Sequence, residues 1–186
     1  IAASARLFRH GDLVKSGAAL ERLAEIDHVV FDKTGVLTEG RPRLKESSPV
    51  AVEMAAPLAR ASRHPLARAL AEAAGPGDVA SEVREHAGLG VEGVIGGRRC
   101  RLGKAAFLGI ESGGAETELW FGFDGDLRIR FVFVDALRAD ACEAVDALRL
   151  RGLTVEILSG DLPGPVTRAA AGVGGVDWRA GCSPQD

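Results

Sequence analysis

The stretch FDKTGVLTEG, residues 31–40, places an aspartate directly behind a short apolar run that has the pattern of a buried strand. In open α/β folds, ligands bind outside the carboxyl ends of the parallel strands. A carboxylate held at such an end can attack a phosphoryl group, so Asp32 is the candidate nucleophile. Lys33 adjoins it, and Thr34 and Gly35 offer hydroxyl and backbone donors to phosphate oxygens. A turn with no chemical role explains the same residues, and this stretch alone leaves both interpretations open.

The composition indicates a globular, soluble chain. Of its 186 residues, 46% are hydrophobic and 26% are charged, and the formal net charge of -3 gives no basic excess for a nucleic-acid partner. The three cysteines, Cys100, Cys142 and Cys182, form no CxxC pair, which disfavours a disulfide framework or a zinc site. No apolar run approaches the roughly 20 residues of a membrane-spanning helix. Because the chain lacks an initial methionine and ends in SPQD, we expect a soluble fragment of a longer protein.

The order of the expected elements indicates a parallel sheet interrupted by an insertion. Outside the insertion, the pattern predicts helices over 16–25, 138–151 and 165–171 and strands over 28–31, 154–158 and 176–178. Strands alternating with helices are typical of α/β folds. Inside it, the pattern predicts helices over 51–61 and 65–74 and strands over 90–95, 98–102, 118–123 and 128–134, with hairpin turns at Gly96-Gly97 and Gly125-Asp126. We therefore expect an α+β module inserted at a loop that begins with residues 39–42.

The segment DKTGVLT resembles the phosphorylation motif of P-type ATPases, in which DKTGT is followed by LT. The resemblance implies that Asp32 accepts the phosphoryl group. Many relatives in the haloacid dehalogenase superfamily carry a second aspartate, a general acid and base, at the position of Thr34, and its replacement implies slow hydrolysis of the aspartyl phosphate. Val36 stands where the family has threonine, which removes one hydroxyl near the phosphate.

A second match implies nucleotide binding by the inserted segment. SRHPLA, residues 62–67, resembles the SEHPLA motif of the heavy-metal pumps, whose histidine orients the nucleotide, and so assigns nucleotide contact to His64. The alternative is that this side chain only caps a helix that begins at Pro65. Two departures from the family pattern, Arg63 for glutamate and Ala59 for an acidic residue that reaches the adenine amine, imply weaker affinity or base selectivity.

A third match concerns glycines. GLGVEG, residues 88–93, followed by Gly103, resembles the glycine-rich segment and the later Gly-Asn pair of the family, which implies that Gly88, Gly90 and Gly103 let the backbone approach the nucleotide. Lys104 replaces the asparagine. The segment does not lie between a strand and the start of a helix, so it is not the dinucleotide-binding motif with a similar glycine spacing.

The last match lies near the second part of the expected α/β domain. VDALR, residues 134–138, resembles the return hinge of the family, and Ser159-Gly160-Asp161 resembles its TGD or SGD loop beside the phosphate. The Ser159 hydroxyl and the Gly160 amide suit a phosphoryl oxygen, and Asp161 would contact the nucleotide or orient the loop. SGD is also a common turn tripeptide, and its order and spacing favour the functional interpretation.

The resemblance identifies the chain as the cytoplasmic catalytic fragment of a heavy-metal-transporting P-type ATPase. It implies an α/β fold with a haloacid dehalogenase-like Rossmannoid phosphorylation domain, an inserted α+β nucleotide-binding domain and a linker from a transmembrane region. The expected bounds are 28–42 and 135–186 for the first, 43–134 for the second and 1–27 for the linker. The alternatives are a soluble phosphatase of the same superfamily and a non-enzymatic nucleotide-binding module.

The resemblance also implies cofactors, cargo and location. ATP and Mg²⁺ are the expected cofactors, with Asp32 and the Thr34 carbonyl as a partial magnesium site. Copper is the expected cargo of the absent membrane domain of a bacterial inner-membrane pump, and zinc or cadmium is the alternative. Pro184-Gln185-Asp186 resembles the segment that precedes the family's phosphate-binding lysine, so we expect the isolated chain to bind nucleotide with negligible ATPase activity.

Overall fold

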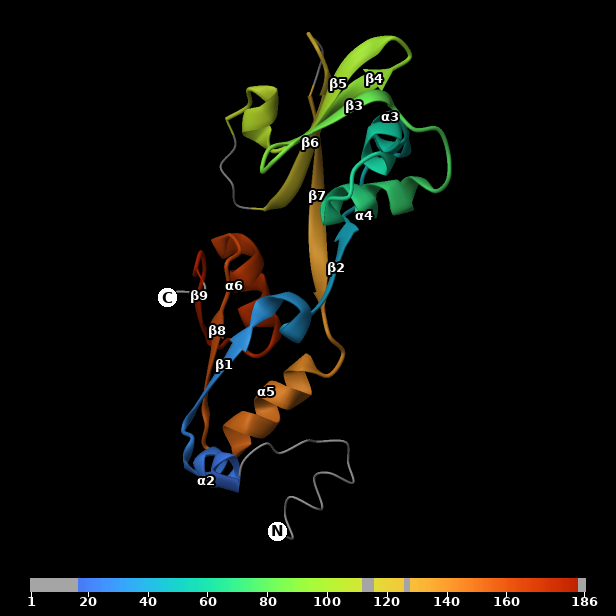
Figure 1. The fold of residues 1–186 in the computed structure, drawn as a ribbon. Coiled ribbons are helices and arrows are strands. Elements are labelled where there is room, and N and C mark those ends of the chain that lie inside the picture. The colour runs from blue at the N-terminus through green and yellow to red at the C-terminus, as the bar shows by residue number, and fades with distance from the viewer. Residues whose placement is uncertain (1–16, 112–115, 126–127, 184–186) are drawn as a thin grey trace.

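The computed structural model describes residues 17–111, 116–125 and 128–183. Two sheets organise these residues (Figure 1): a three-stranded sheet in the order β1-β8-β9 and a six-stranded sheet in the order β2-β7-β6-β5-β4-β3. Each sheet has its own hydrophobic core. The mixed α/β class expected from the sequence is therefore confirmed.

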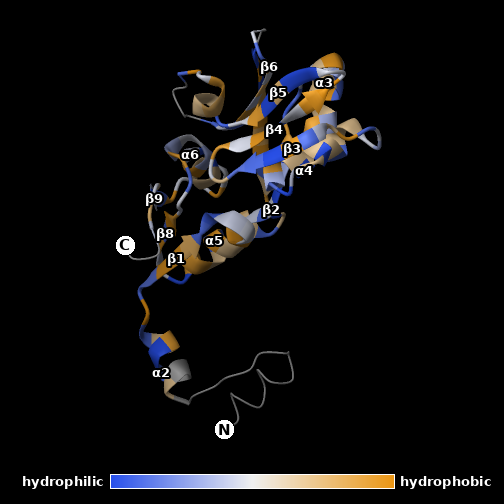
Figure 2. Ribbon diagram, turned by 45° about the horizontal axis from the view of Figure 1, so that its top comes forward, coloured by the Kyte–Doolittle hydropathy of each residue, from blue (hydrophilic) through white to orange (hydrophobic). Residues whose placement is uncertain are grey.

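The parallel sheet and two helices form what we call the parallel-sheet lobe. It contains β1 (His28–Asp32), α5 (Ala141–Leu150), β8 (Thr154–Leu158), α6 (Pro163–Gly172) and β9 (Asp177–Arg179). Apolar residues four and seven positions after the first residue of α5 give this helix one apolar face. Val145, Ile157 and Val166 are completely buried in the core, and Figure 2 shows β1 and β8 as mainly hydrophobic. The parallel register pairs Asp32 with Leu158, so both strands end at the same edge.

The six-stranded antiparallel sheet and its two helices form the antiparallel-sheet lobe. Its elements are β2 (Thr38–Leu44), α3 (Pro49–Arg60), α4 (Pro65–Ala74), β3 (Ser81–His86), β4 (Gly90–Ile95), β5 (Arg98–Gly103), β6 (Thr117–Phe123) and β7 (Arg128–Leu137). Leu58 of α3 and Leu70 of α4 pack with Phe121 and Phe131 of the sheet, and all four are completely buried. Burying large apolar side chains of this kind stabilises a fold by about 1.5–3 kcal/mol each.

Strands β2 and β7 also connect the two lobes, and we call their paired segments, Thr38–Leu44 and residues 133–137, the ribbon (Figure 1). The expectation of a loop over residues 39–42 was wrong, because these residues lie within β2. Pro42 is tolerated there since β2 is an edge strand. A register shift between Thr38 and Pro42 accommodates Gly40 with a φ of 66°.

Other expected elements are mostly confirmed, with shifted ends. β7 continues to Leu137, so the helix expected from residue 138 begins at Ala141, and α6 begins at Pro163. The pair Gly96-Gly97 forms the expected two-residue hairpin between Ile95 and Arg98. β3 was not predicted, because its sequence SEVREH lacks alternation and forms the exposed opposite edge of the sheet.

Several expectations fall on residues outside the described ranges. They concern the start of the helix expected over 16–25, Asp126 in the second hairpin turn, residues 1–16 of the expected linker and residues 184–186. Helix α2 (Gly17–Glu25) precedes β1. Of the helices that the structure describes, none is both long enough and apolar enough to cross a membrane.

Candidate active site

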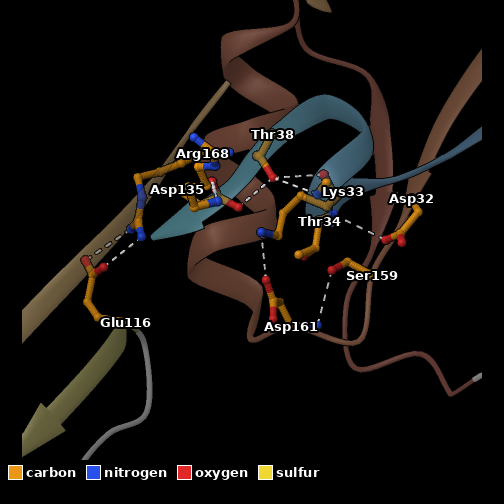
Figure 3. Close-up of polar contacts among 11 residues, drawn as sticks. Asp32, Lys33, Thr34, Thr38, Glu116, Asp135, Ser159, Asp161 and Arg168 are labelled. Carbon is orange, nitrogen blue, oxygen red and sulfur yellow. Dashed lines mark hydrogen bonds and ion pairs between the residues drawn. The ribbon is translucent and has the colours of Figure 1, made fainter. Parts of the chain in front are cut away.

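Asp32 ends β1 and opens a tight turn, η1 (Lys33–Leu37), that keeps its carboxylate exposed. The Thr34 amide donates a hydrogen bond to Oδ1 of Asp32 over 3.3 Å. Gly35 adopts a φ of 75°, a value that favours glycine, and its amide donates to Thr38 Oγ1 over 3.3 Å. The strand therefore fixes the backbone of Asp32, while the turn leaves the carboxylate accessible to a ligand (Figure 3).

Lys33, the residue after Asp32, carries a buried positive charge. Its side chain is 5% exposed, and Nζ lies 2.7 Å from Oδ2 of Asp161, whose side chain is 43% exposed. Figure 3 shows this contact between the turn after β1 and the loop after β8. A buried ammonium needs a charged partner, so the ion pair holds the turn after β1 and the loop after β8 together.

The loop Ser159-Gly160-Asp161 follows β8 at the same sheet edge and is fixed from both sides. The Ser159 amide donates to the Arg179 carbonyl, and the Ser159 carbonyl accepts from the Cys182 amide, both over 3.0 Å. The buried Ser159 hydroxyl accepts from the Asp161 amide over 3.2 Å, which leaves its proton free to donate to a phosphoryl oxygen. The predicted residues Asp32, Lys33, Thr34, Ser159 and Asp161 thus lie at one edge of the sheet (Figure 3), and Gly160 lies in the same loop as Ser159 and Asp161.

Thr38 and Asp135 join this region through a contact that sequence reasoning missed. The Thr38 hydroxyl donates to Asp135 Oδ2 over 2.6 Å, and the Arg41 amide donates to Oδ1 over 3.1 Å. The Thr38 hydroxyl also lies 3.0 Å from the Lys33 carbonyl. Thr38 belongs to the LT of the motif, but no local signal pairs it with a residue 97 positions away.

A cavity of about 490 Å³, the interlobe cavity, lies between the lobes. Lys33, Thr34 and Asp161 line it from the parallel-sheet lobe, and His64 and Thr117 line it from the antiparallel-sheet lobe. Its walls therefore combine three of the strand-end candidates with the histidine predicted to contact nucleotide, whereas Asp32, Ser159 and Gly160 are not among its lining residues.

A second cavity of about 390 Å³, the glycine cavity, lies within the antiparallel-sheet lobe and is lined by all four predicted nucleotide-binding residues, His64, Gly88, Gly90 and Gly103. His64 also realises the capping alternative, because its Nδ1 accepts from the Leu66 amide over 3.3 Å at the start of α4. Since Nδ1 is the acceptor, Nε2 is the nitrogen that can donate to a ligand. Capping and nucleotide contact are therefore compatible.

Two of the glycines have a structural role that the sequence did not indicate. Gly90 and Gly103 pair across β4 and β5, and a Cβ on Gly103 would lie 2.3 Å from the Leu89 carbonyl oxygen. A Cβ on Gly90 would lie 2.4 Å from the Leu102 carbonyl oxygen. These glycines let two strands approach one another at the wall of the glycine cavity, whereas Gly88, with a φ of 72°, turns the chain in open space.

The departures Arg63, Ala59 and Lys104 lie in different environments. Ala59 is completely buried in the core and does not line the glycine cavity, whereas Lys104 does. Glu85 supplies an acidic wall instead, and it accepts from the Arg63 amide over 3.3 Å and from the Ser62 hydroxyl over 3.1 Å. An acidic group thus faces the cavity from β3, a strand that sequence reasoning missed.

His86 lines the glycine cavity and pairs with a carboxylate outside its lining. Its Nε2 lies 3.2 Å from Oε1 of Glu92. Contact with His86 lowers the pKa of Glu92, and nearby Arg101 and Arg84 add to this effect. Glu92 therefore remains an anion in neutral solution.

The residues at the strand end fit part of a magnesium site. Magnesium prefers about six oxygen ligands, and the Asp32 carboxylate and Thr34 carbonyl are of that type. In the described ranges, no three His, Cys, Asp or Glu side chains gather as a potential metal site. Phosphate oxygens, water or further protein groups would complete the coordination.

Comparison with known proteins places these features in a family. A family model described as "haloacid dehalogenase-like hydrolase" matches residues 26–186. The chain is 40% identical over 192 residues to "Nitrogen fixation protein FixI" of Rhizobium meliloti, covering 100% of this chain and 25% of that protein. It is 43% identical over 168 residues to "Probable copper-transporting ATPase SynA" of Synechococcus elongatus, which covers 81% of this chain and 21% of that protein. A "Zinc/cadmium/lead-transporting P-type ATPase" of Escherichia coli is 36% identical over 199 residues, with 96% and 27% covered.

Solved structures agree with these relatives. A zinc-transporting PIB-type ATPase in the E2.Pi state superposes with a TM-score of 0.78 and 32% identity, covering 98% of this chain and 34% of that one. The catalytic domain of the CPx-ATPase CopB-B gives a TM-score of 0.82 and 25% identity, and the match covers 98% of this chain and 74% of that one. The chain spans about a quarter of the length of the curated relatives it matches.

Proposed function

Because this chain belongs to the haloacid dehalogenase-like hydrolase family, we propose that it is the ATP-binding catalytic part of a heavy-metal-transporting P-type ATPase that phosphorylates Asp32. The observation that carries the proposal is the position of His64, which lines both the glycine cavity and the interlobe cavity. A nucleotide with its base in the glycine cavity would extend its phosphates past His64 toward Lys33 and Thr34.

The chemistry follows from the groups at the strand end. A carboxylate oxygen of Asp32 bonds to the γ-phosphorus of ATP, the bond to the bridging oxygen breaks, and its electron pair leaves with ADP. The Lys33 ammonium and the Ser159 hydroxyl stabilise charge on the transferred oxygens. Bound Mg²⁺, held in part by Asp32 and the Thr34 carbonyl, would neutralise further phosphate charge. Thr34 supplies no carboxylate for activating water, so the aspartyl phosphate persists.

We assign the phosphorylation domain to residues 28–42 and 135–186 and the nucleotide-binding domain to residues 43–134. The separate cores of the two lobes support this division. The ribbon crosses both proposed junctions, because Pro42 pairs with Asp135. The division therefore falls within paired strands rather than within loops.

We propose copper as the cargo and the cytoplasmic face of a bacterial inner membrane as the location. The relative named as copper-transporting is 43% identical, compared with 36% for the relative named for zinc, cadmium and lead. Metal-stimulated ATP hydrolysis by the full-length protein in membrane vesicles tests this choice. Stimulation by Cu⁺ supports it, and stimulation by Zn²⁺ or Cd²⁺ alone contradicts it.

The proposed phosphorylation is tested on the full-length protein with γ-labelled ATP. We expect an acid-stable, hydroxylamine-labile phosphoprotein that Asp32→Asn abolishes. Asp27→Asn is the matched control, because Asp27 is an exposed aspartate just before the other end of β1. Label that survives Asp32→Asn would place the nucleophile elsewhere.

The isolated chain separates the proposed pump from a soluble phosphatase. We expect it to bind ATP, seen as amide shifts of His64, Gly88 and Gly103, with negligible turnover because its magnesium site is partial. Robust magnesium-dependent hydrolysis of ATP or p-nitrophenyl phosphate, abolished by Asp32→Asn, would instead favour a self-sufficient phosphatase.

A further inference from the structure

A two-pronged ion pair joins the lobes beside the interlobe cavity. Arg168 of α6 donates from Nη1 to Oε1 of Glu116 over 3.0 Å and from Nη2 to Oε2 over 2.7 Å. Glu116 directly precedes β6 of the antiparallel-sheet lobe, while α6 belongs to the parallel-sheet lobe. Figure 3 shows the pair on the same side of the site as Asp135. The contact therefore spans the two bodies that the ribbon connects.

The position of Arg168 links it to the phosphate-binding candidates. α6 begins two residues after Asp161, so Arg168 stands on the helix that follows the Ser159-Gly160-Asp161 loop. Arg168 and Asp161 line the interlobe cavity together with Lys33. Phosphates entering this cavity would come close to the Arg168 guanidinium, which is hydrogen-bonded to Glu116.

The strength of this ion pair suits a reversible contact. The side chains of Arg168 and Glu116 are 48% and 30% exposed, so solvent weakens their attraction and salt screens it. A guanidinium can donate two parallel hydrogen bonds to a phosphate, just as it does to a carboxylate. A triphosphate carries several negative charges against the single charge of Glu116, so it can compete for Arg168.

We propose that the Glu116–Arg168 pair is a latch that holds the lobes in one orientation and that the phosphates of a nucleotide release it by taking Arg168 from Glu116. The release step rests on the proposed nucleotide-binding function. The latch itself does not, because its effect on lobe orientation is measurable without any nucleotide. Arg168 thereby becomes a phosphate-binding residue whose availability depends on the relative position of the lobes.

The latch is tested by measuring the distance between the lobes in the 186-residue chain. Spin labels are placed on native Cys142 of α5, which is exposed, and on Val50→Cys of α3, with Cys182→Ser to remove the remaining accessible thiol. We expect a narrow distance distribution at low salt that broadens at high salt. Arg168→Gln and Glu116→Gln should broaden it at low salt, shifting the latched-to-open ratio by about two- to five-fold.

Arg179→Gln is the matched control, because Arg179 forms a similar two-pronged pair with Glu156 inside one lobe. Its distance distribution should match that of the parent. Distributions for Arg168→Gln and Glu116→Gln that equal the parent at low salt would overturn the latch.

The release step is tested with inorganic triphosphate and adenosine as separate probes. Glu116→Gln should bind triphosphate about two- to five-fold more tightly and Arg168→Gln more weakly, while adenosine binding stays unchanged in both. Equal triphosphate affinity in all three proteins would overturn release by phosphate. Failure of the parent to bind adenosine or ATP would refute the proposed nucleotide function, while the salt-dependent distances still decide the latch.

Discussion

The two partners of the Lys33–Asp161 ion pair are unequally exposed, which predicts unequal effects of their removal. Asp161→Asn leaves a buried ammonium without its counter-charge and should cost about 2–4 kcal/mol of unfolding free energy. Lys33→Met removes the buried charge and leaves Asp161 partly hydrated, so it should cost less. Urea unfolding measures the loss of unfolding free energy in both variants. Equal losses, or a larger loss in Lys33→Met, would show that Asp161 does little to stabilise the buried Lys33 charge.

Gly103 has no room for a side chain, which predicts a loss of stability when this proposed nucleotide-binding residue is replaced. Gly103→Ala would place a Cβ against the backbone of Leu89 and Gly90, so it should destabilise the chain by about 1–3 kcal/mol. Arg99→Ala on the exposed part of β5 is the control. Thermal unfolding measures the cost, and a Gly103→Ala variant as stable as the control would show that the strands can separate freely.

His64 caps α4, and its proposed contact with nucleotide predicts a second, larger effect of its removal. Loss of the α4 cap in His64→Ala should cost about 1 kcal/mol of stability. Loss of a nucleotide contact should lower ATP affinity by more than this stability loss explains. Calorimetric titration of the folded variant with ATP measures the second effect. Unchanged affinity together with reduced stability would reduce His64 to a helix cap.

At the scale of elements, Glu156 connects all three strands of the parallel sheet. It stands on the central strand β8 and pairs with Arg179 of β9 and His28 of β1. Hydrogen bonding from Arg179 lowers the pKa of Glu156, and the Arg179 charge and His28 add to this effect. A depressed carboxyl pKa means that the stabilising effect is complete above the unfolded-state pKa, about 4.3, and disappears as the pH falls through the folded-state value.

Glu156→Gln should therefore be less stable than the parent at pH 7, and the difference should shrink as the pH falls below about 4. Denaturant unfolding from pH 7 to pH 3 measures it. A difference that stays constant with pH would assign the loss to packing rather than to charge.

Strand β5 buries one thiol and thereby makes it unreactive. Burial, with a contribution from Asp124, raises the pKa of Cys100 to about 11, and the thiol lies 3.4 Å from the Gly93 carbonyl oxygen. Because the thiolate is the reactive form, Cys100 should resist Ellman's reagent at pH 8, whereas Cys142 and Cys182 should react. Mass spectrometry before and after urea unfolding identifies the labelled sites. Rapid labelling of Cys100 in the native chain would indicate that β5 opens frequently.

The sequence predicted elements whose signals are local and missed those that depend on distant partners. Pro65 behind His64 marks the start of α4, and the pair Gly96-Gly97 marks a hairpin. β2 and β3 are polar edge strands whose identity depends on pairing with β7 and β4, so no alternation revealed them.

The site shows the same division. Asp32 and the nearby motif residues could be proposed from their order along the chain, because a family pattern is itself local. The Thr38–Asp135 and Glu116–Arg168 contacts join residues 97 and 52 positions apart, so only the fold brings them together. The mutual contact of Gly90 and Gly103 was likewise invisible, although both glycines had been identified.

At the scale of the whole molecule, the ribbon predicts movement of the lobes as bodies. Each lobe has its own core, and β2 and β7 connect them. Solution scattering of the chain should show a change in radius of gyration when ATP and Mg²⁺ are added. Asp135→Ala removes the bonds to Thr38 and Arg41 and should increase the spread of shapes. A single radius of gyration, unaffected by ligand and by this substitution, would contradict lobe movement.

The pairing of β2 with β7, the two strands that connect the lobes, also restricts how the lobes can move. If β2 and β7 were not paired, the antiparallel-sheet lobe could move in all directions relative to Asp32. A hydrogen-bonded pair of strands resists sliding along its length but yields to bending across its face. The body it carries is thereby restricted to an arc. Under the proposed function, delivery of a bound nucleotide to Asp32 would then be a movement in one direction, limited by the stiffness of the backbone around Asp135.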